Sequence, residues 1–160
     1  GRQPTLAGAW QATRRALGNA LVFALALLVV CLVWVRAASA ISIFLPVSTG
    51  AGPLEYLGYF GIGSLVGSLF AAIAFAAAAF ALPMIADRET DSVTAVVTSI
   101  NAVLRNKRTM VAWAAIIVGS LVLGFTTAFI AFGLLIPVLG YATWHAYEET
   151  IDASAWPRAG

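Results

Sequence analysis

The chain has 160 residues, of which 61% are hydrophobic and only 10% are charged, and its formal net charge is +2. Soluble domains carry about 25% charged residues, so this composition excludes an ordinary soluble protein. The few basic residues form no stripe or cluster of the kind that binds nucleic acid, and we expect no nucleic-acid partner.

Three stretches contain no Asp, Glu, Lys or Arg: 16–35, 56–86 and 109–147. Because about 20 apolar residues cross a bilayer as one helix, the last stretch predicts two crossings with a turn at 124–127. The backbone within a bilayer must be satisfied by helices or a closed barrel. No apolar/polar alternation favours a barrel, so we predict an all-α membrane protein. Its four transmembrane helices are approximately Leu17–Phe44, Leu57–Ile85, Val111–Leu123 with its flanks, and Ala128–Ala146.

A helix of another kind is predicted between the second and third spans. Within Ser92–Leu104, apolar residues recur at i, i+3 and i+4, and Asp91 is placed to cap the N-terminus. Such an amphipathic helix lies in the membrane interface. The apolar positions are Val93, Val96, Val97, Ile100, Val103 and Leu104, and the polar positions that face away are Thr94, Thr98, Asn101 and Arg105.

The N-terminal segment repeats this design, because Thr5–Asn19 aligns with Ser92–Asn106. The exits also match: Pro83 and Pro137 each interrupt an apolar helical run, where proline removes a hydrogen bond and kinks the helix. We therefore predict a single transmembrane domain, 1–160, built from tandem parallel repeats of about 5–86 and 92–147. Each repeat is an interfacial amphipathic helix followed by a transmembrane hairpin, and a short polar tail, 148–160, follows.

The basic residues predict the orientation. They precede the first span or lie between the second and third spans, whereas the loop from Leu45 to Tyr56 carries only Glu55. The positive-inside rule then places both termini of this chain and the middle loop in the cytoplasm. The basic residues are Arg2, Arg14, Arg15, Arg88, Arg105, Lys107 and Arg108.

Two stretches carry a resemblance, Ala81–Met110 (ALPMIADRETDSVTAVVTSINAVLRNKRTM) and Ile136–Tyr147 (IPVLGYATWHAY). From about Thr5 to Tyr147 the chain resembles an uncharacterised family of predicted bacterial integral membrane proteins, some of whose members are labelled as a cytochrome c oxidase subunit. The resemblance implies a multi-pass protein of the bacterial inner membrane. Members usually have six spans, so we expect a further N-terminal repeat unit in the gene product. The family supplies no established activity and therefore no catalytic residue.

Residues for catalysis are scarce. There is one histidine, His145, and one cysteine, Cys31, whereas a haem–copper catalytic subunit needs several histidines. No hydrolase, nucleotide-binding or metal motif is present. We expect no enzymatic activity, no cofactor and no metal. His145 is a weak candidate to bind a pigment or haem; its alternative role is within an aromatic belt with Trp144 and Tyr147.

Charged residues near the span ends are further candidates. Arg36 lies within the first span, where a charge is costly; it either snorkels to the surface, pairs with Glu55, or serves transport. Asp87 and Arg88 begin a charged cluster at the cytoplasmic exit of the second span, with Glu89 and Asp91. Their spacing could suit a metal or proton site, but mixed charges at a membrane exit more typically form a solvated capping arrangement.

Small residues mark a helix-packing face on the second span. Such rows let helices approach closely in lipid, either within the chain or against a partner. The rows contain Gly63, Gly67 and Ala71, and beside them Ser64 and Ser68.

We therefore expect a non-catalytic integral membrane subunit that packs with lipids and with other membrane protein subunits. The host would be a respiratory or related electron-transfer complex, an expectation that rests on the resemblance alone. The alternative is a small transporter or lipid-handling protein, because repeats and broken helices recur in transporter folds.

Overall fold

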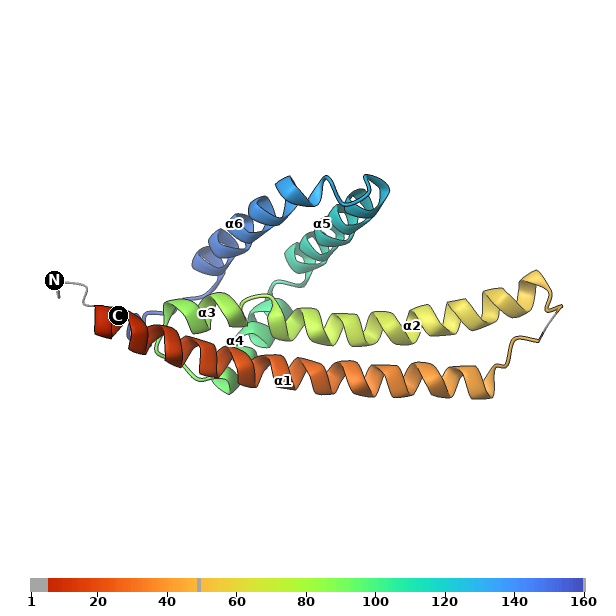
Figure 1. Cartoon of the computed structure of the whole chain (residues 1–160), viewed down its shortest axis with the longest axis horizontal. Helices are drawn as coiled ribbons and strands as arrows, with labels where there is room; N and C mark the ends of the chain where they lie inside the picture. The colour runs from red at the N-terminus through yellow and green to blue at the C-terminus, as the bar shows by residue number, and fades with distance from the viewer. Residues whose placement is uncertain (1–5, 49, 160) are drawn as a thin grey trace. The chain divides into compact units, whose positions relative to one another are not determined.

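The computed structural model describes residues 6–48 and 50–159 (Figure 1). Within these ranges the chain is helical, and the only strand-like pairing there is an isolated bridge between Arg88 and Arg158. The prediction of an all-α protein is thus confirmed. The helices are α1 (Leu6–Phe44), α2 (Pro53–Ala78), α3 (Ala81–Asp87), α4 (Ser92–Arg105), α5 (Lys107–Thr126) and α6 (Phe132–Thr150).

Three helical segments are long and apolar enough to cross a membrane: Ala16–Phe44, Pro53–Asp87 and Lys107–Thr126. They correspond to the first three predicted spans. The fourth predicted span falls mostly in α6, which is not among the three. Its helix begins only at Phe132, after the apolar residues 128–131 have been used in a turn, and its last turn carries Glu148 and Glu149.

The chain divides into two compact units, residues 21–75 and residues 1–20 with 76–160, and each is described by itself. In the unit 21–75, α1 and α2 run antiparallel (Figure 1). The hydroxyls of Ser42 and Tyr59 lie 3.0 Å apart. A Cβ atom added to Gly67 would lie 3.5 Å from the indole Nε1 of Trp34, an ordinary van der Waals contact.

The second predicted span is broken where its proline removes a hydrogen bond. Pro83 has no N–H to donate to the carbonyl of Ala79, and α2 ends at Ala78 while α3 begins at Ala81. The proline itself lies in the first turn of α3, where a missing N–H costs little. The fully buried side chain of Ser99 inserts at the break. Its hydroxyl donates a hydrogen bond to the Ala76 carbonyl and accepts one from the Phe80 N–H.

Helix α4 matches its predicted bounds and N-cap. The Thr94 N–H donates to Asp91 Oδ1 over 2.7 Å, and the Thr94 hydroxyl donates to Oδ2 over 3.1 Å. The face of α4 that is buried, however, is not the predicted apolar face, on which Val93 is 70% exposed and Leu104 is 55% exposed. It is not the predicted polar face either. The buried residues are small and follow helical spacing, and they let α4 pack closely on α3. They are Ser92, Ala95, Ser99 and Ala102.

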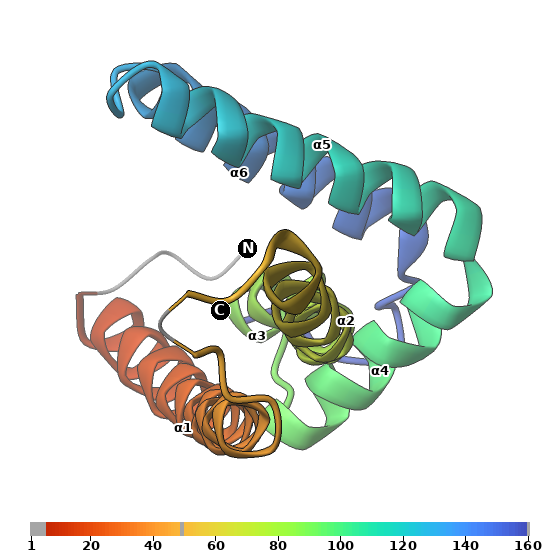
Figure 2. The same ribbon diagram turned by 90° about the vertical axis from the view of Figure 1, so that its right-hand side faces the viewer.

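Helices α5 and α6 lie side by side and antiparallel (Figures 1 and 2). The turn between them spans residues 127–131, slightly later than the predicted 124–127. Two of its residues have left-handed backbones, Ala128 at φ 50° and Phe129 at φ 68°. The Phe129 N–H donates to the Gly124 carbonyl over 2.8 Å, which satisfies a carbonyl left free at the end of α5.

The N-terminal segment differs from its predicted form. We expected a separate helix up to Asn19, but α1 runs without a break from Leu6 to Phe44. Asn106, its counterpart, does separate α4 from α5, with φ −112° and ψ 39°. Asn19 instead stays helical and directs its amide to the Thr90 carbonyl, 2.9 Å away.

Candidate functional site

Asp87 is the centre of a polar cluster at the end of α3. The buried Tyr147 hydroxyl of α6 donates to Asp87 Oδ2 over 3.0 Å. The Arg88 Nε donates to the same oxygen over 2.6 Å. This hydrogen bond raises the pKa of the Arg88 guanidinium, which therefore stays charged. The predicted exit residues Asp87 and Arg88 therefore do lie together, and they are fixed by a tyrosine from a distant helix.

The C-terminal segment folds back onto this cluster. The Ala159 N–H donates to the Asp87 carbonyl, and the Glu89 N–H donates to the Pro157 carbonyl, both over 2.8 Å. The Arg88 Nη1 donates to the Trp156 carbonyl over 3.1 Å. Ile151 and Ala153 at the start of the segment are buried. The predicted polar tail is thus an ordered part of the site.

The connection between α3 and α4 is held by hydrogen bonds with Asn19 of α1. Asn19 donates to the Thr90 carbonyl, and the Ser92 hydroxyl donates to the Asn19 carbonyl over 2.6 Å. Both Thr90 and Ser92 are buried. Hydrogen bonds from Thr94 lower the pKa of Asp91, which keeps this N-cap ionised.

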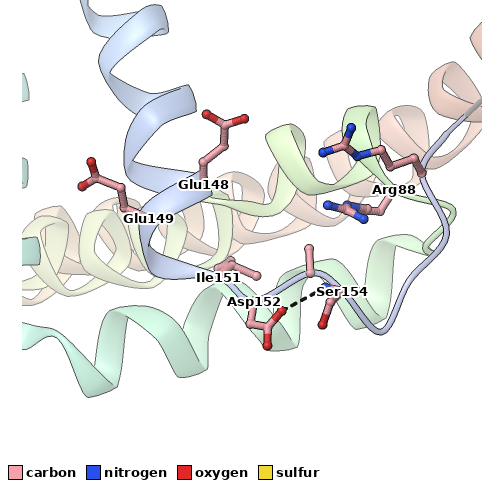
Figure 3. A pocket seen from close by; sticks show the side chains of 8 residues that line it. Arg88, Glu148, Glu149, Ile151, Asp152 and Ser154 are labelled. Carbon is pink, nitrogen blue, oxygen red and sulfur yellow. Dashed lines mark hydrogen bonds between the residues drawn. The ribbon is translucent and has the colours of Figure 1, made fainter.

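A pocket of about 510 Å³ opens beside the cluster (Figure 3). Arg88 lies on one side, and Glu148 and Glu149, at the end of α6, lie on the other. The Ser154 hydroxyl and the Ser154 N–H, which donates to Asp152 over 3.1 Å, lower the pKa of Asp152. The pocket therefore presents both signs of charge. Its lining comprises Arg88, Glu148, Glu149, Ile151, Asp152, Ala153, Ser154 and Arg158.

His145, the weak candidate for a pigment or haem ligand, does not itself line this pocket. Its ring meets the Tyr141 ring edge to face, with centroids 4.3 Å apart. Its Nδ1 lies 3.6 Å from a Glu148 carboxylate oxygen, and the side chain is half exposed. Within residues 6–48 and 50–159, no three His, Cys, Asp or Glu side chains gather as metal ligands.

Arg36 and Glu55 are both in the unit 21–75, and their pairing stays a hypothesis. The described residues contain no ion pair within 4.0 Å between them. The Arg36 side chain is exposed, as the snorkelling alternative requires. Glu55 lies in the first turn of α2, where a carboxylate interacts favourably with the helix dipole.

Of the two glycines on the predicted packing face of α2, only one has another side chain close to it. Gly67 faces Trp34, whereas a Cβ atom on Gly63 would meet nothing within 4 Å. Helix α2 has no buried residue in the structure. Most of this small-residue face is therefore open.

Comparison with known proteins identifies the family. A family model described as "Predicted integral membrane protein (DUF2189)" matches residues 1–87, more than half of the chain. The chain belongs to this family. No curated protein and no solved structure matches it. For this DUF2189 member, integral membrane character thus rests on both the family and the apolar helices.

The sequence pointed to Asp87 and Arg88 but missed their partners. The aromatic-belt interpretation of Tyr147 does not predict its contact with Asp87, and the apolar pattern of α4 does not predict that Ser99 is buried. A usable signal was present in α4, where the small residues Ser92, Ala95, Ser99 and Ala102 recur with helical spacing. Nothing in the sequence of 151–159 indicated that its backbone would pair with residues 87–89.

Proposed function

We propose that this protein is a non-catalytic subunit that packs within a larger membrane complex. The open small-residue face of α2 carries the proposal. In lipid, helices associate where small residues let backbones approach. On this face an added Cβ on Gly63 would meet nothing within 4 Å, and Ser64, Ser68 and Ala71 are exposed. A partner helix seated there would use a surface that contact with lipid alone does not require.

The absence of an enzymatic role is also a proposal. It is supported by the single histidine and single cysteine of the chain, and by the use of the Asp87 carboxylate in hydrogen bonds to Tyr147 and Arg88. A carboxylate held in this way serves to join α3 to α6.

We further propose a location in the bacterial inner membrane, with both termini of this chain cytoplasmic. The distribution of Arg and Lys supports the orientation. For the second repeat, an interfacial helix before a membrane hairpin is supported by α4, whose apolar residues Val93, Val97 and Leu104 are exposed before α5 begins. A respiratory or related electron-transfer host is supported by the family resemblance alone.

A small transporter or lipid-handling protein is the second candidate. The break between α2 and α3 favours it, since broken helices form substrate sites in transporters. Here, however, Ser99 occupies the break and satisfies both Ala76 and Phe80. Substrate-dependent flux into liposomes that contain the purified protein would support this candidate over the first.

Purification from the native membrane in mild detergent, followed by mass spectrometry, tests the subunit proposal. We expect partner subunits in fixed stoichiometry with the native chain, and their loss from Gly63→Leu, whose side chain would fill the open face. Leu65→Ala is the control, because Leu65 is 71% exposed and lies outside the small-residue rows. A native protein that migrates alone, or a Gly63→Leu variant that keeps every partner, would contradict the proposal.

A further inference from the structure

The pocket at the end of α6 is lined by charges of opposite sign that form no close ion pairs with one another. Arg88 and Arg158 supply positive charge, and Glu148, Glu149 and Asp152 supply negative charge. Among the described residues, neither arginine forms an ion pair within 4.0 Å with any of these three acids. Its volume of about 510 Å³ is within the range of small-molecule sites. Such a pocket is suited to a ligand that itself carries both charges.

The positive side retains unused hydrogen-bond donors. Arg88 uses its Nε for Asp87 and one Nη1 hydrogen for the Trp156 carbonyl, and its guanidinium also interacts with the Tyr147 hydroxyl, so most of the free donors on this side belong to Arg158. Arg158 is exposed, and its backbone is held beside Arg88 by the bridge between these residues. Guanidinium groups bind phosphate oxygens strongly because their N–H donors match that geometry.

The negative side contains one acid with no other role. Glu148 lies near His145, and Asp152 accepts from the Ser154 N–H. The Glu149 carboxylate has no such partner within the described ranges. It lines the pocket from the last turn of α6 and points away from Arg88 (Figure 3). A primary ammonium group could donate hydrogen bonds to these carboxylates.

The pocket also lies at the end of two apolar segments. Arg88 directly follows the candidate span Pro53–Asp87. Glu148 directly follows the charge-free run that ends at Tyr147. In an integral membrane protein, the first charged residues after an apolar helix lie at headgroup level. Lipid headgroups are therefore the dipolar molecules that the pocket meets at the highest concentration.

We propose that this pocket binds the phosphoethanolamine headgroup of a membrane phospholipid. Arg88 and Arg158 would hold the phosphodiester, and Glu149, with Glu148 and Asp152, would hold the ammonium group. Phosphatidylglycerol lacks the ammonium group, and the quaternary ammonium of phosphatidylcholine has no N–H to donate, so both bind less well. The inference rests on the membrane embedding of the chain and not on its role as a subunit.

Native mass spectrometry tests the proposal. The full chain is placed in mixed micelles with equimolar phosphatidylethanolamine, phosphatidylcholine and phosphatidylglycerol of identical acyl chains. We expect preferential retention of phosphatidylethanolamine. Arg158→Gln should lower retention of all three lipids, and Glu149→Gln should lower the preference for ethanolamine over choline, each by roughly two- to fivefold, as is typical of exposed charge pairs. Both residues are exposed, so helix content by circular dichroism should not change.

Arg105→Gln is the matched control, since Arg105 is exposed at the end of α4 and does not line the pocket. It should retain the native lipid preference. Equal retention of the three lipids by the native chain, or a preference that Glu149→Gln leaves intact, would overturn the proposal. Soluble phosphoethanolamine, added in excess, should compete with the lipid for the pocket if the headgroup alone is recognised. Inorganic phosphate that competes equally well would show a simple anion site, and this result would also overturn the proposal.

Discussion

The Ser99 hydroxyl donates a hydrogen bond of 2.8 Å to the Ala76 carbonyl and thereby occupies the place of a missing backbone bond. In an unbroken helix, that carbonyl would accept from the Phe80 N–H. Here the Phe80 N–H donates to Ser99 Oγ instead, over 3.1 Å. One side chain of α4 therefore satisfies both backbone groups exposed by the break between α2 and α3, and it joins α4 to that break.

Ser99→Ala should destabilise the protein because it leaves the Phe80 N–H without a partner at a fully buried position. We expect a loss of about 1–3 kcal/mol in the free energy of unfolding, the usual cost of an unsatisfied buried group. Denaturant titration in detergent micelles, followed by circular dichroism, measures it. Thr98→Ala removes a neighbouring hydroxyl that has no hydrogen bond in the described structure, and it should change stability much less. Equal losses from the two variants would exclude the bridging role.

The position of this break follows from the sequence, but its repair does not. Pro83 cannot donate to the residue four positions earlier, which places the interruption near Ala79. Asp91 likewise predicts the start of α4, because its carboxylate caps the first turn. The choice of Ser99 as the inserted side chain depends on which face of α4 packs on α3. That choice is decided by tertiary packing of small residues and not by the apolar periodicity.

Only the contacts between residues adjacent in sequence could be predicted for the site. Asp87 and Arg88 are adjacent, so their proximity needs no fold. Tyr147 is far away in sequence, and an aromatic residue at a span end is equally typical of an interfacial belt. The backbone pairing of 87–89 with 157–159 involves no distinctive side chain. Long-range contacts of this kind leave no periodic signal in a single sequence.

Tyr147→Phe should weaken the attachment of α6 to α3. The substitution keeps the buried ring and removes only the hydroxyl that donates to Asp87. A hydrogen bond to a charged group contributes about 1.5–3 kcal/mol, and partial exposure of Asp87 places the expected loss near the lower end. Tyr141→Phe is the control, because Tyr141 is 69% exposed. Thermal unfolding in micelles should separate the two variants; a native-like Tyr147→Phe would mean that Arg88 alone positions Asp87.

Asp91 should make the stability of α4 dependent on pH. Its pKa is lowered from the usual 3.8 by hydrogen bonds from Thr94. A lowered folded-state pKa contributes stability above the unfolded-state value, and this stability is lost as the pH falls through the folded-state pKa. Asp91→Asn keeps a capping oxygen but does not titrate. The native chain should therefore lose its advantage over Asp91→Asn on acidification below the usual Asp pKa of 3.8.

Unfolding of the two proteins across this pH range measures the effect. Because Asp152 also has a lowered pKa, the native curve alone would combine both groups, and only the difference between the two proteins isolates Asp91. A difference that stays constant from neutral to acidic pH would show that the cap does not depend on the charge of Asp91.

Gly124→Ala should destabilise the turn between α5 and α6. An added Cβ atom would fall directly on the Phe132 ring, and that ring has Phe125 and Phe129 as neighbours, with centroids 6.2 Å and 5.9 Å away. Overpacking of this kind costs about 1–3 kcal/mol. Gly119→Ala, in the same helix with nothing within 4 Å of the added atom, should be neutral or slightly stabilising, because alanine is the better helix former.

A double-mutant cycle with Phe132→Ala separates the steric effect from any loss of glycine flexibility. If the added methyl group acts through the Phe132 ring, Gly124→Ala should cost little once that ring is absent, and the two substitutions should be strongly non-additive. Unfolding free energies of the four proteins, measured in the same detergent, give the coupling directly. Additive costs would instead place the requirement for glycine in the backbone of α5, where the Gly124 carbonyl accepts the hydrogen bond that closes the turn.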